Sequence, residues 1–365
     1  MPHLDLTTDV VTLTRQLVDI ESVSRDEQVI ADVVEKALRE LGHLEVVRRG
    51  HTLVARTQLD RASRVVIAGH LDTVPVNNNL PSRLDEETGI LHGLGTCDMK
   101  GGDAVLLKLA ATLIEPIHDV TYVLYEAEEI EETYNGLRLL SESDPDLLAA
   151  DFAILMEPSN GVVEAGCQGT LRVEVRTNGE RSHSARSWRG VNAIHGAGEV
   201  LARLNAYEPR KPVIDGLEYH EGLNAVFISG GVAGNVIPDE CVVTVNFRFA
   251  PDRSESDALA FVRETFDGFD LTVTDTAPGA LPGLAQPAAR AFIDAVGGPD
   301  GMVNPKFGWT DVARFTGLGV PAVNYGPGDP MFAHKQDEHV EIDQIRRCEQ
   351  QLRSWLTNKE NLGNR

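Results

Sequence analysis

Histidine and carboxylate side chains recur where the predicted buried strands of this chain end. They are His70 and Asp72 after VVIAG, Glu128 and Glu129 after TYVLYEA, Glu157 after FAILM, and His334 beyond PAVNYGPG. Asp98, in GTCDMKGG, stands at the start of a predicted helix, which is the end of a helix that favours an anion. In an open α/β sheet, ligands bind at the carboxyl ends of the strands. We therefore expect these side chains to converge on one edge of a sheet.

A cluster of this composition predicts a site for divalent metal ions. Several carboxylates in one place repel one another strongly unless a cation lies between them. Imidazole with carboxylate, and without cysteine, suits zinc, manganese or cobalt better than an iron–sulfur cluster or calcium. Other residues of these types are interpreted as ordinary surface: Glu131 and Glu132 in EAEEIEE, and the histidines His195 and His339.

The elements that must position these residues alternate between helices and buried strands. The sequence predicts helices at 8–19 with a Thr N-cap, at 26–41, at 103–114 and at 342–357, and strands at 64–69, 120–127 and 152–156. Apolar strands that alternate with helices are typical of a largely parallel sheet covered by helices. We therefore expect an α/β fold with a helix-flanked, mainly parallel catalytic sheet.

The pattern changes between residues 170 and 281. Here half-exposed strands and helices follow one another in the order β-α-β-β-α-β, which is that of a ferredoxin-like unit. The end of the chain then resumes the first pattern. We therefore predict a catalytic domain made of residues 1–169 and 282–365, with an inserted α+β domain at 170–281.

Composition narrows the possible partners and the compartment. The chain has 33 basic and 56 acidic residues, so its net charge is −23. Such a surface repels phosphate backbones and anionic lipids, so neither nucleic acid nor a membrane is an expected partner. Four scattered cysteines without a CxxC pair do not form a disulfide scaffold, and the N-terminus lacks the basic start and apolar stretch of a signal peptide. We expect a cytoplasmic protein.

Seven motifs, in order along the whole chain, resemble those of one family. They are GHLDTVP, GLGTCDMKGG, EAEEI, MEPS, HSARSWRGVNAI, GNVIPDE and AHKQDEHV. The family is the di-zinc aminoacylase and carboxypeptidase family of metal-dependent amidohydrolases. The resemblance implies two divalent metal ions per chain, zinc by expectation with cobalt as a substitute. It implies these ligands: His70, Asp98 and Glu157 for one ion, and Asp98, Glu129 and His334 for the other.

The resemblance also implies roles for residues that do not bind metal. Asp72 would orient the His70 imidazole from behind. Glu128 would be the general base that takes a proton from a water bridging the two metal ions and then passes it to the leaving nitrogen. Ala127 stands where the family often has Asp, but that position is not a ligand. Amide hydrolysis at neutral pH is the chemistry that this set would perform.

In the family, the inserted domain is a lid that also forms the dimer interface. The resemblance therefore implies a homodimer in which His183, of the HSA motif, reaches into the partner subunit's site and hydrogen-bonds the oxyanion. The alternative interpretation is that His183 is a capping or surface histidine.

The segments NVIPDE, NFRFAP and GWTDVARF most resemble the actinobacterial form of the family branch that hydrolyses N-succinyl-diaminopimelate in lysine biosynthesis. That substrate carries three carboxylates, and the resemblance implies contacts to it from Arg248 and Asn235, with Arg314 as a further candidate. Gln168 stands where many members of this branch have Arg. An acetylornithine deacetylase or another N-acyl-amino-acid amidohydrolase would use the same metal site. Outside the enzymes, the alternative is a non-catalytic metal-binding dimerisation module.

Overall fold

The computed structural model describes residues 2–297 and 301–358 and divides into two compact units. The first unit comprises Met1–Ala165, Gly283–Asn304 and Arg314–Arg365, and the second comprises Gly166–Pro282 and Pro305–Ala313. Each unit is described by itself below.

The segment Pro305–Ala313 corrects the boundary drawn from the sequence, which assigned it to the catalytic domain. Its contacts with the ends of the inserted domain give the reason. The Trp309 indole donates a hydrogen bond to the carbonyl oxygen of Pro278 at 3.0 Å. The Cys167 thiol lies 3.7 Å from the carbonyl oxygen of Thr310. The chain pattern alone carries no record of such contacts between distant segments.

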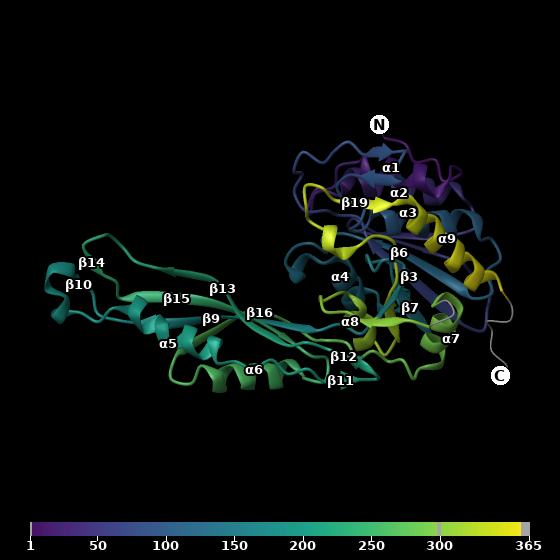
Figure 1. Ribbon diagram of the computed structural model, residues 1–365. Helices are drawn as coiled ribbons and strands as arrows, with labels where there is room; N and C mark the ends of the chain where they lie inside the picture. The colour runs from purple at the N-terminus through teal and green to yellow at the C-terminus, as the bar shows by residue number, and fades with distance from the viewer. Residues whose placement is uncertain (1, 298–300, 359–365) are drawn as a thin grey trace. The chain divides into compact units, whose positions relative to one another are not determined.

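The first unit is built around an eight-stranded mixed sheet (Figure 1). The strand order is β1 (Glu45–Arg49), β2 (Thr52–Arg56), β6 (Asp119–Tyr125), β3 (Arg64–His70), β7 (Phe152–Leu155), β18 (Ala322–Asn324), β8 (Val163–Ala165) and β17 (Val303–Pro305). The pairs β3–β6, β3–β7 and β7–β18 are parallel, whereas β1–β2, β2–β6 and β8–β18 are antiparallel. Strands β6 and β7 are buried at every residue, as expected for the centre of a sheet covered on both faces. The predicted α/β fold class is confirmed.

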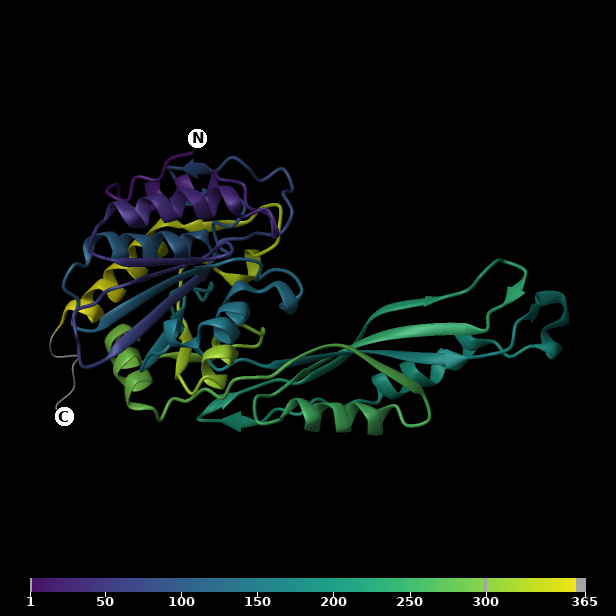
Figure 2. The ribbon, with the colours of Figure 1, turned by 180° about the vertical axis from the view of Figure 1, so that it is seen from behind.

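Helices lie on both sides of this sheet (Figures 1 and 2). They are α1 (Val10–Val18), α2 (Gln28–Glu40), α3 (Lys100–Thr112), α4 (Gly136–Ser143), α7 (Pro287–Val296), α8 (Val312–Gly317) and α9 (Ile342–Thr357). A small sheet orders β19 (His339–Glu341), β5 (Ile90–His92) and β4 (Arg83–Asp85). Helices α1, α3 and α9 pack against one another. Among the described residues, no helix combines the length and the apolar character needed to cross a bilayer.

The first helix corrects the predicted Thr N-cap. The N-cap of α1 is Asp9, whose carboxylate accepts the backbone N–H groups of Val11 and Thr12 at 3.0 and 3.1 Å. Asp is as good an N-cap as Thr in hydrogen bonding, and its charge also meets the positive end of the helix dipole.

The second unit follows the predicted order β-α-β-β-α-β. Its elements are β9 (Gly169–Asn178), α5 (Ala193–Asn205), β13 (Gly222–Gly230), β15 (Glu240–Phe249), α6 (Glu255–Thr265) and β16 (Asp270–Ala277). The four strands form an antiparallel sheet in the order β13-β15-β9-β16. In β15, Val243, Val245 and Phe247 are buried in one cluster with residues of both helices, while the residues between them are only half-buried. Two short pairs complete the unit: β10 (Ser182–His183) with β14 (Val236–Ile237), and β11 (Val213–Ile214) with β12 (Leu217–Glu218).

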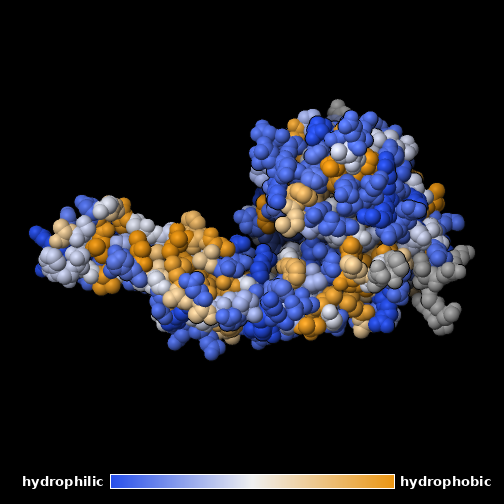
Figure 3. All heavy atoms as spheres, in the orientation of Figure 1, coloured by the Kyte–Doolittle hydropathy of each residue, from blue (hydrophilic) through white to orange (hydrophobic). Residues whose placement is uncertain are grey.

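Strand β13 lies at one end of this sheet, and the described part of the chain places no strand beyond it. It carries consecutive exposed apolar side chains: Val226, Phe227 and Ile228 are 57%, 64% and 49% exposed. Figure 3 shows apolar side chains gathered over this part of the unit. Unpaired backbone groups beside exposed apolar side chains form a ready pairing surface.

Candidate metal centre

His70 is the last residue of β3 and is 1% exposed. Its Nδ1 atom lies 3.0 Å from the backbone carbonyl oxygen of Asp72, an acceptor, so the ring holds its proton on Nδ1. Nε2 faces Asp98, whose Oδ1 is 3.2 Å away, and while no metal ion is bound a proton on Nε2 donates to that oxygen. Loss of that proton to a metal ion would leave a neutral imidazole fixed in the Nδ1–H tautomer, a ligand whose free nitrogen is already aimed.

Asp72 is completely buried and links two loops of the site. Its Oδ1 lies 3.5 Å from His70 Nδ1, farther than its own carbonyl oxygen. The two carboxylate oxygens accept the backbone N–H groups of Glu128 at 3.0 Å and Glu129 at 3.1 Å. Asp72 therefore holds the backbone of the glutamate pair at least as directly as it holds the imidazole.

The structure brings the five predicted ligands together as two trios that share one residue. The trios are His70 with Asp98 and Glu157, and Asp98 with Glu129 and His334. In each trio the ligand-type atoms all lie within 4.8 Å of one another. His334 Nε2 is 3.5 Å from Asp98 Oδ2 and 2.9 Å from Glu129 Oε2. Sequence positions as far apart as 70 and 334 thus meet because the loops after several strands end at the same sheet edge.

The histidine and carboxylate side chains of this cluster shift one another's pKa values. Burial would raise the pKa of the Asp98 carboxyl, but hydrogen bonds from His334 and His70 outweigh it and hold that pKa well below its usual range. Hydrogen bonds to Asp98 and Glu129 raise the pKa of His334 to about 10. Burial raises the pKa of the Glu129 carboxyl, against the effect of His334. When no metal ion is bound, protonated imidazole balances the negative charge of these carboxylates. A metal ion that binds here therefore displaces protons from the imidazole.

Glu128 follows β6 together with Glu129 but belongs to neither trio. Its backbone is held by Asp72, and its side chain is half-buried. The structure thus separates the adjacent glutamates, since only Glu129 lies among the ligand-type atoms.

Sequence reasoning missed Glu338, a carboxylate that holds the loop of the predicted ligand Asp98. Glu338, 1% exposed, accepts the backbone N–H groups of Cys97 at 3.0 Å and Asp98 at 3.1 Å. It lies four residues after His334, so it joins the loops of two predicted ligands. The signal available was the acidic residue in KQDEHV, but nothing in the sequence says that it is buried.

Three predicted functional residues belong to the second unit. His183 and Asn235 are exposed, and the short β10–β14 pair brings them together, because the Ser184 N–H donates to the Asn235 carbonyl oxygen at 2.9 Å. His183 Nδ1 accepts the Ala185 N–H at 3.0 Å, which leaves Nε2 outside this bond. Arg248 stands on β15 and is half-buried, and burial lowers the pKa of its guanidinium.

Arg314, a candidate for substrate binding, and Gln168, which stands where many relatives have Arg, both have partners within the protein. Arg314, only 11% exposed, lies 3.3 Å from a carboxylate oxygen of Glu132, the residue interpreted as solvated surface. Gln168 is buried and donates its amide to the His220 carbonyl oxygen at 2.8 Å. The Gln that replaces the usual Arg is therefore used to hold backbone within the second unit.

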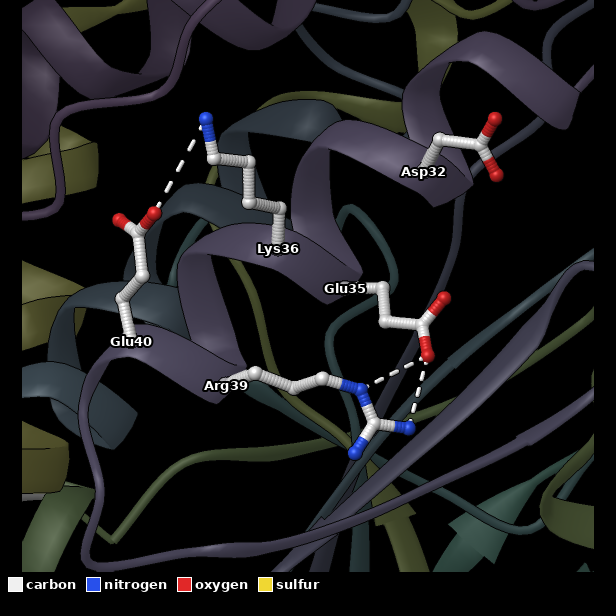
Figure 4. A pocket seen from close by; sticks show the side chains of 5 residues that line it. All are labelled: Asp32, Glu35, Lys36, Arg39 and Glu40. Carbon is white, nitrogen blue, oxygen red and sulfur yellow. Dashed lines mark hydrogen bonds and ion pairs between the residues drawn. The ribbon is translucent and has the colours of Figure 1, made fainter.

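A shallow hollow of about 500 Å³ lies on the outer face of α2, and none of the predicted site residues lines it. It is lined by five charged side chains, shown in Figure 4: Asp32, Glu35, Lys36, Arg39 and Glu40. Two ion pairs join positions four apart on this helix, with Arg39 Nη2 2.8 Å from Glu35 and Lys36 Nζ 3.9 Å from Glu40, and Arg48 of β1 pairs with Asp32 and Glu35. Such pairs are typical of a solvated helix face, and we assign this hollow no function.

The chain is similar to known proteins over nearly its whole length. Residues 66–358 match the family described as peptidase family M20/M25/M40. A Mycobacterium tuberculosis chain named as a candidate succinyl-diaminopimelate desuccinylase is 56% identical over 356 residues, 97% of this chain and 99% of that one. The succinyl-diaminopimelate desuccinylase of Corynebacterium glutamicum is 48% identical over 366 residues, 98% of each chain. A Staphylococcus aureus tripeptidase structure covers 97% of this chain and 98% of its own with a TM-score of 0.78, but at 21% identity it shows the fold alone. The family resemblance predicted from the motifs is confirmed.

Proposed function

Because this chain belongs to peptidase family M20/M25/M40, we propose that it hydrolyses N-succinyl-LL-2,6-diaminopimelate to succinate and LL-2,6-diaminopimelate. The observation that carries the proposal is 48% identity to a succinyl-diaminopimelate desuccinylase over 98% of both chains. The two trios that share Asp98 supply a site of the right chemistry. The reaction is a step of lysine and diaminopimelate biosynthesis. A cytoplasmic location is consistent with four buried cysteines that form no disulfide.

The five side chains of the trios would hold two divalent cations, zinc by preference. The donor set fits, because imidazole nitrogen and carboxylate oxygen are the ligands that zinc and cobalt accept. Three carboxylates also go far toward balancing the charge of two dications. When bound, the cations would polarise the amide carbonyl and make water a stronger acid.

Glu128 is the general base in this proposal. Its backbone N–H is bound to Asp72, next to the loops of the ligands, and its carboxylate belongs to neither trio, so it would move a proton between water and the leaving nitrogen. Asp72 positions it, since its carboxylate holds the backbone of Glu128 and its carbonyl oxygen holds the ring of His70.

The substrate carries three carboxylates, and a chain of net charge −23 must supply local cations for them. We assign Arg248 to this task as the cation and Asn235 as a neutral amide donor to the substrate. Arg314 is a weaker candidate because it already pairs with Glu132.

A homodimer formed through the second unit completes the proposal. The exposed apolar edge strand β13 supports it, because a second copy of the strand would pair the edge and cover Phe227 and its neighbours. His183 would then act in the partner subunit's site as a donor to the oxyanion. Its exposure, and the Nε2 atom outside its bond to Ala185, suit that role.

A small substrate panel combined with metal analysis tests the proposal. Purified protein loaded with zinc is assayed on succinyl-diaminopimelate, acetylornithine and acetylmethionine, and metal content is measured in the same sample. We expect two zinc ions per chain and the highest kcat/KM on the succinyl substrate. Preference for acetylornithine would reassign the substrate, and metal-loaded protein inert on all three would favour the non-catalytic binding module.

A further inference from the structure

The segment that leads into α2 contacts the loops of the metal centre without supplying a ligand. The Ser22 hydroxyl donates to the Leu71 carbonyl oxygen at 2.7 Å, and the Ser24 hydroxyl donates to Asp72 Oδ2 at 2.7 Å. The backbone of Thr73 exchanges hydrogen bonds with Ser22 and Ser24. This segment is therefore fastened to the loop that follows β3.

Glu27, at the end of this segment, extends the same support to the loop that follows β6. Its side chain is completely buried. One oxygen, Oε1, accepts the backbone N–H groups of Arg25 at 3.0 Å and of Ala127 at 3.1 Å. Both residues have a left-handed backbone, with φ of 79° for Arg25 and 57° for Ala127. Such a conformation is unfavourable for residues other than glycine, so it persists only where surrounding contacts hold it.

The turn at Ala127 sets the direction of the two glutamates that follow it. The N–H groups of residues 127, 128 and 129 all end on buried carboxylates: the first on Glu27 and the other two on Asp72. Asp72 therefore fixes the glutamate pair from one side, and Glu27 fixes the turn that delivers them. We propose that Glu27 is a positioning residue that acts through the Ala127 turn on Glu129, as a metal ligand, and on Glu128, as the base. The inference rests on the proposed function for these two roles.

A separate metal site is the other interpretation of this place. The Glu27 carboxylate, His51 and Glu126 offer ligand-type atoms within 4.8 Å of one another. The ring of His51 argues against a cation, because its Nδ1 lies 3.1 Å from Arg48 Nη2 and must accept that hydrogen bond. A neutral ring then carries its proton on Nε2 and has no lone pair left for a metal ion. A guanidinium beside the ring adds repulsion, so we assign the trio to hydrogen bonding.

Two variants of Glu27 separate positioning from charge. Glu27→Ala removes the acceptor of both N–H groups, whereas Glu27→Gln keeps a carbonyl oxygen in the place of Oε1. The amide nitrogen of Gln would replace Oε2, which has no hydrogen-bond partner among the described residues, so no bond is lost. If Glu27→Ala does not fold, Glu27→Asp retains the charge but draws the acceptor back by one methylene.

The chain offers a matched control at the other end of the same strand. Asp119, the first residue of β6, is also a buried carboxylate that accepts loop N–H groups, from Leu59 at 2.9 Å and from Arg61 at 2.8 Å. Asp119→Ala removes these two bonds, a bond from the Thr57 hydroxyl at 2.7 Å and a contact with Arg64 at 3.7 Å, all at the edge of the sheet opposite the metal centre. It should lower the melting temperature as Glu27→Ala does and leave the metal centre intact.

The decisive measurement is titration of metal-free protein with Co²⁺, followed by its visible absorption. Glu129→Ala identifies the equivalent of Co²⁺ that depends on Glu129. In Glu27→Ala or Glu27→Asp we expect that equivalent to bind about 10–100-fold more weakly, as when a residue behind a ligand is lost. In the same two variants, the affinity for the other equivalent of Co²⁺ should stay within about threefold of wild type. In Asp119→Ala and in Glu27→Gln, the affinities for both equivalents should stay within about threefold of wild type.

The outcomes distinguish the inference from its alternatives. Loss of both equivalents to the same degree, or of neither, would overturn positioning through the Ala127 turn. Weak binding in Glu27→Gln as well would assign the effect to charge instead. The Co²⁺ readout does not use the substrate, so a wild-type enzyme inactive on succinyl-diaminopimelate would refute the proposed function while the test of Glu27 still stands. In active enzyme, kcat should fall more than KM rises, because substrate contacts are assigned elsewhere.

Discussion

The two units hold their candidate functional residues in opposite ways. In the first, His70 and Glu157 are 1% and 6% exposed and only His334 among the five predicted ligands is exposed, and buried carboxylates tie the loops of His70, Asp98 and Glu129. In the second, His183 and Asn235 are exposed on a short two-stranded pair. The first arrangement is complete within one chain, because one sheet brings all its residues together. In the second unit, exposure leaves His183 and Asn235 able to contact a group outside their own unit.

The first prediction removes the residue on which the interior arrangement turns. Asp98→Ala should lose both metal ions and all measurable activity, because Asp98 is the one residue common to both trios. Metal content after dialysis, measured beside activity, checks this. Two tightly bound metal ions in the variant would show that the proposed ligand set is wrong. Chelation of the wild-type enzyme should reproduce the loss, and added zinc should reverse it.

The second prediction separates chemistry from metal binding within the same unit. Glu128→Ala should lower kcat by about 100-fold or more, the usual cost of losing a general base, while metal content stays at two ions per chain. Glu128 belongs to neither trio, so its loss leaves the ligands in place. Activity within about tenfold of wild type would remove Glu128 from the role of base.

The third prediction asks whether the exposed unit acts on a partner. His183→Ala should lower kcat by about 100–1000-fold, the range seen when an oxyanion donor is removed. When His183→Ala and Glu128→Ala chains are mixed and allowed to exchange, activity should rise toward about a quarter of wild type. Half of the chains then pair as heterodimers, and each heterodimer has one intact site of two.

Absence of recovery in this mixture, with exchange shown by a mass tag, would mean that His183 works in its own subunit or not at all. Phe227→Asp supplies a control, because a charge on the exposed face of β13 should weaken pairing of the edge strands. Fully active protein that sediments as a monomer would contradict the homodimer itself.

How much the sequence could predict differs between the two kinds of residue in the first unit. The ligands could be found because each follows a strand whose apolar run is visible, and the ends of parallel strands meet at one edge. Glu27 and Glu338 could not, because their function depends on backbone N–H groups of loops far away in the chain. Glu338 and Cys97 are 241 residues apart, and no periodicity records that contact.

The second unit shows the same limit at larger scale. Its β-α-β-β-α-β order was readable in part from alternation, since buried residues alternate with half-buried or exposed ones along β9 and β15. The membership of Pro305–Ala313 was not, because it depends on contacts such as that of Trp309 with Pro278. Sequence patterns predict elements, whereas the packing of segments distant in the chain decides which elements share a unit.

The last prediction tests whether zinc affinity of the metal centre falls gradually as the residues behind its ligands are removed. A contact with a partner subunit, by contrast, is either made or lost. Asp72→Ala removes the acceptor of two N–H groups and the carboxylate near His70, so metal affinity should fall by about 10–100-fold with both ions still able to bind. Ser24→Ala removes one donor to Asp72 and leaves that carboxylate in place, so its effect should be smaller, about threefold or less. Calorimetric titration of both variants with zinc measures the series. If Ser24→Ala equals Asp72→Ala, the Ser24 hydroxyl rather than the Asp72 carboxylate would be what holds the loop. If Asp72→Ala loses both ions outright, as expected of Asp98→Ala, then Asp72 is indispensable to the ligands themselves and not only to their orientation.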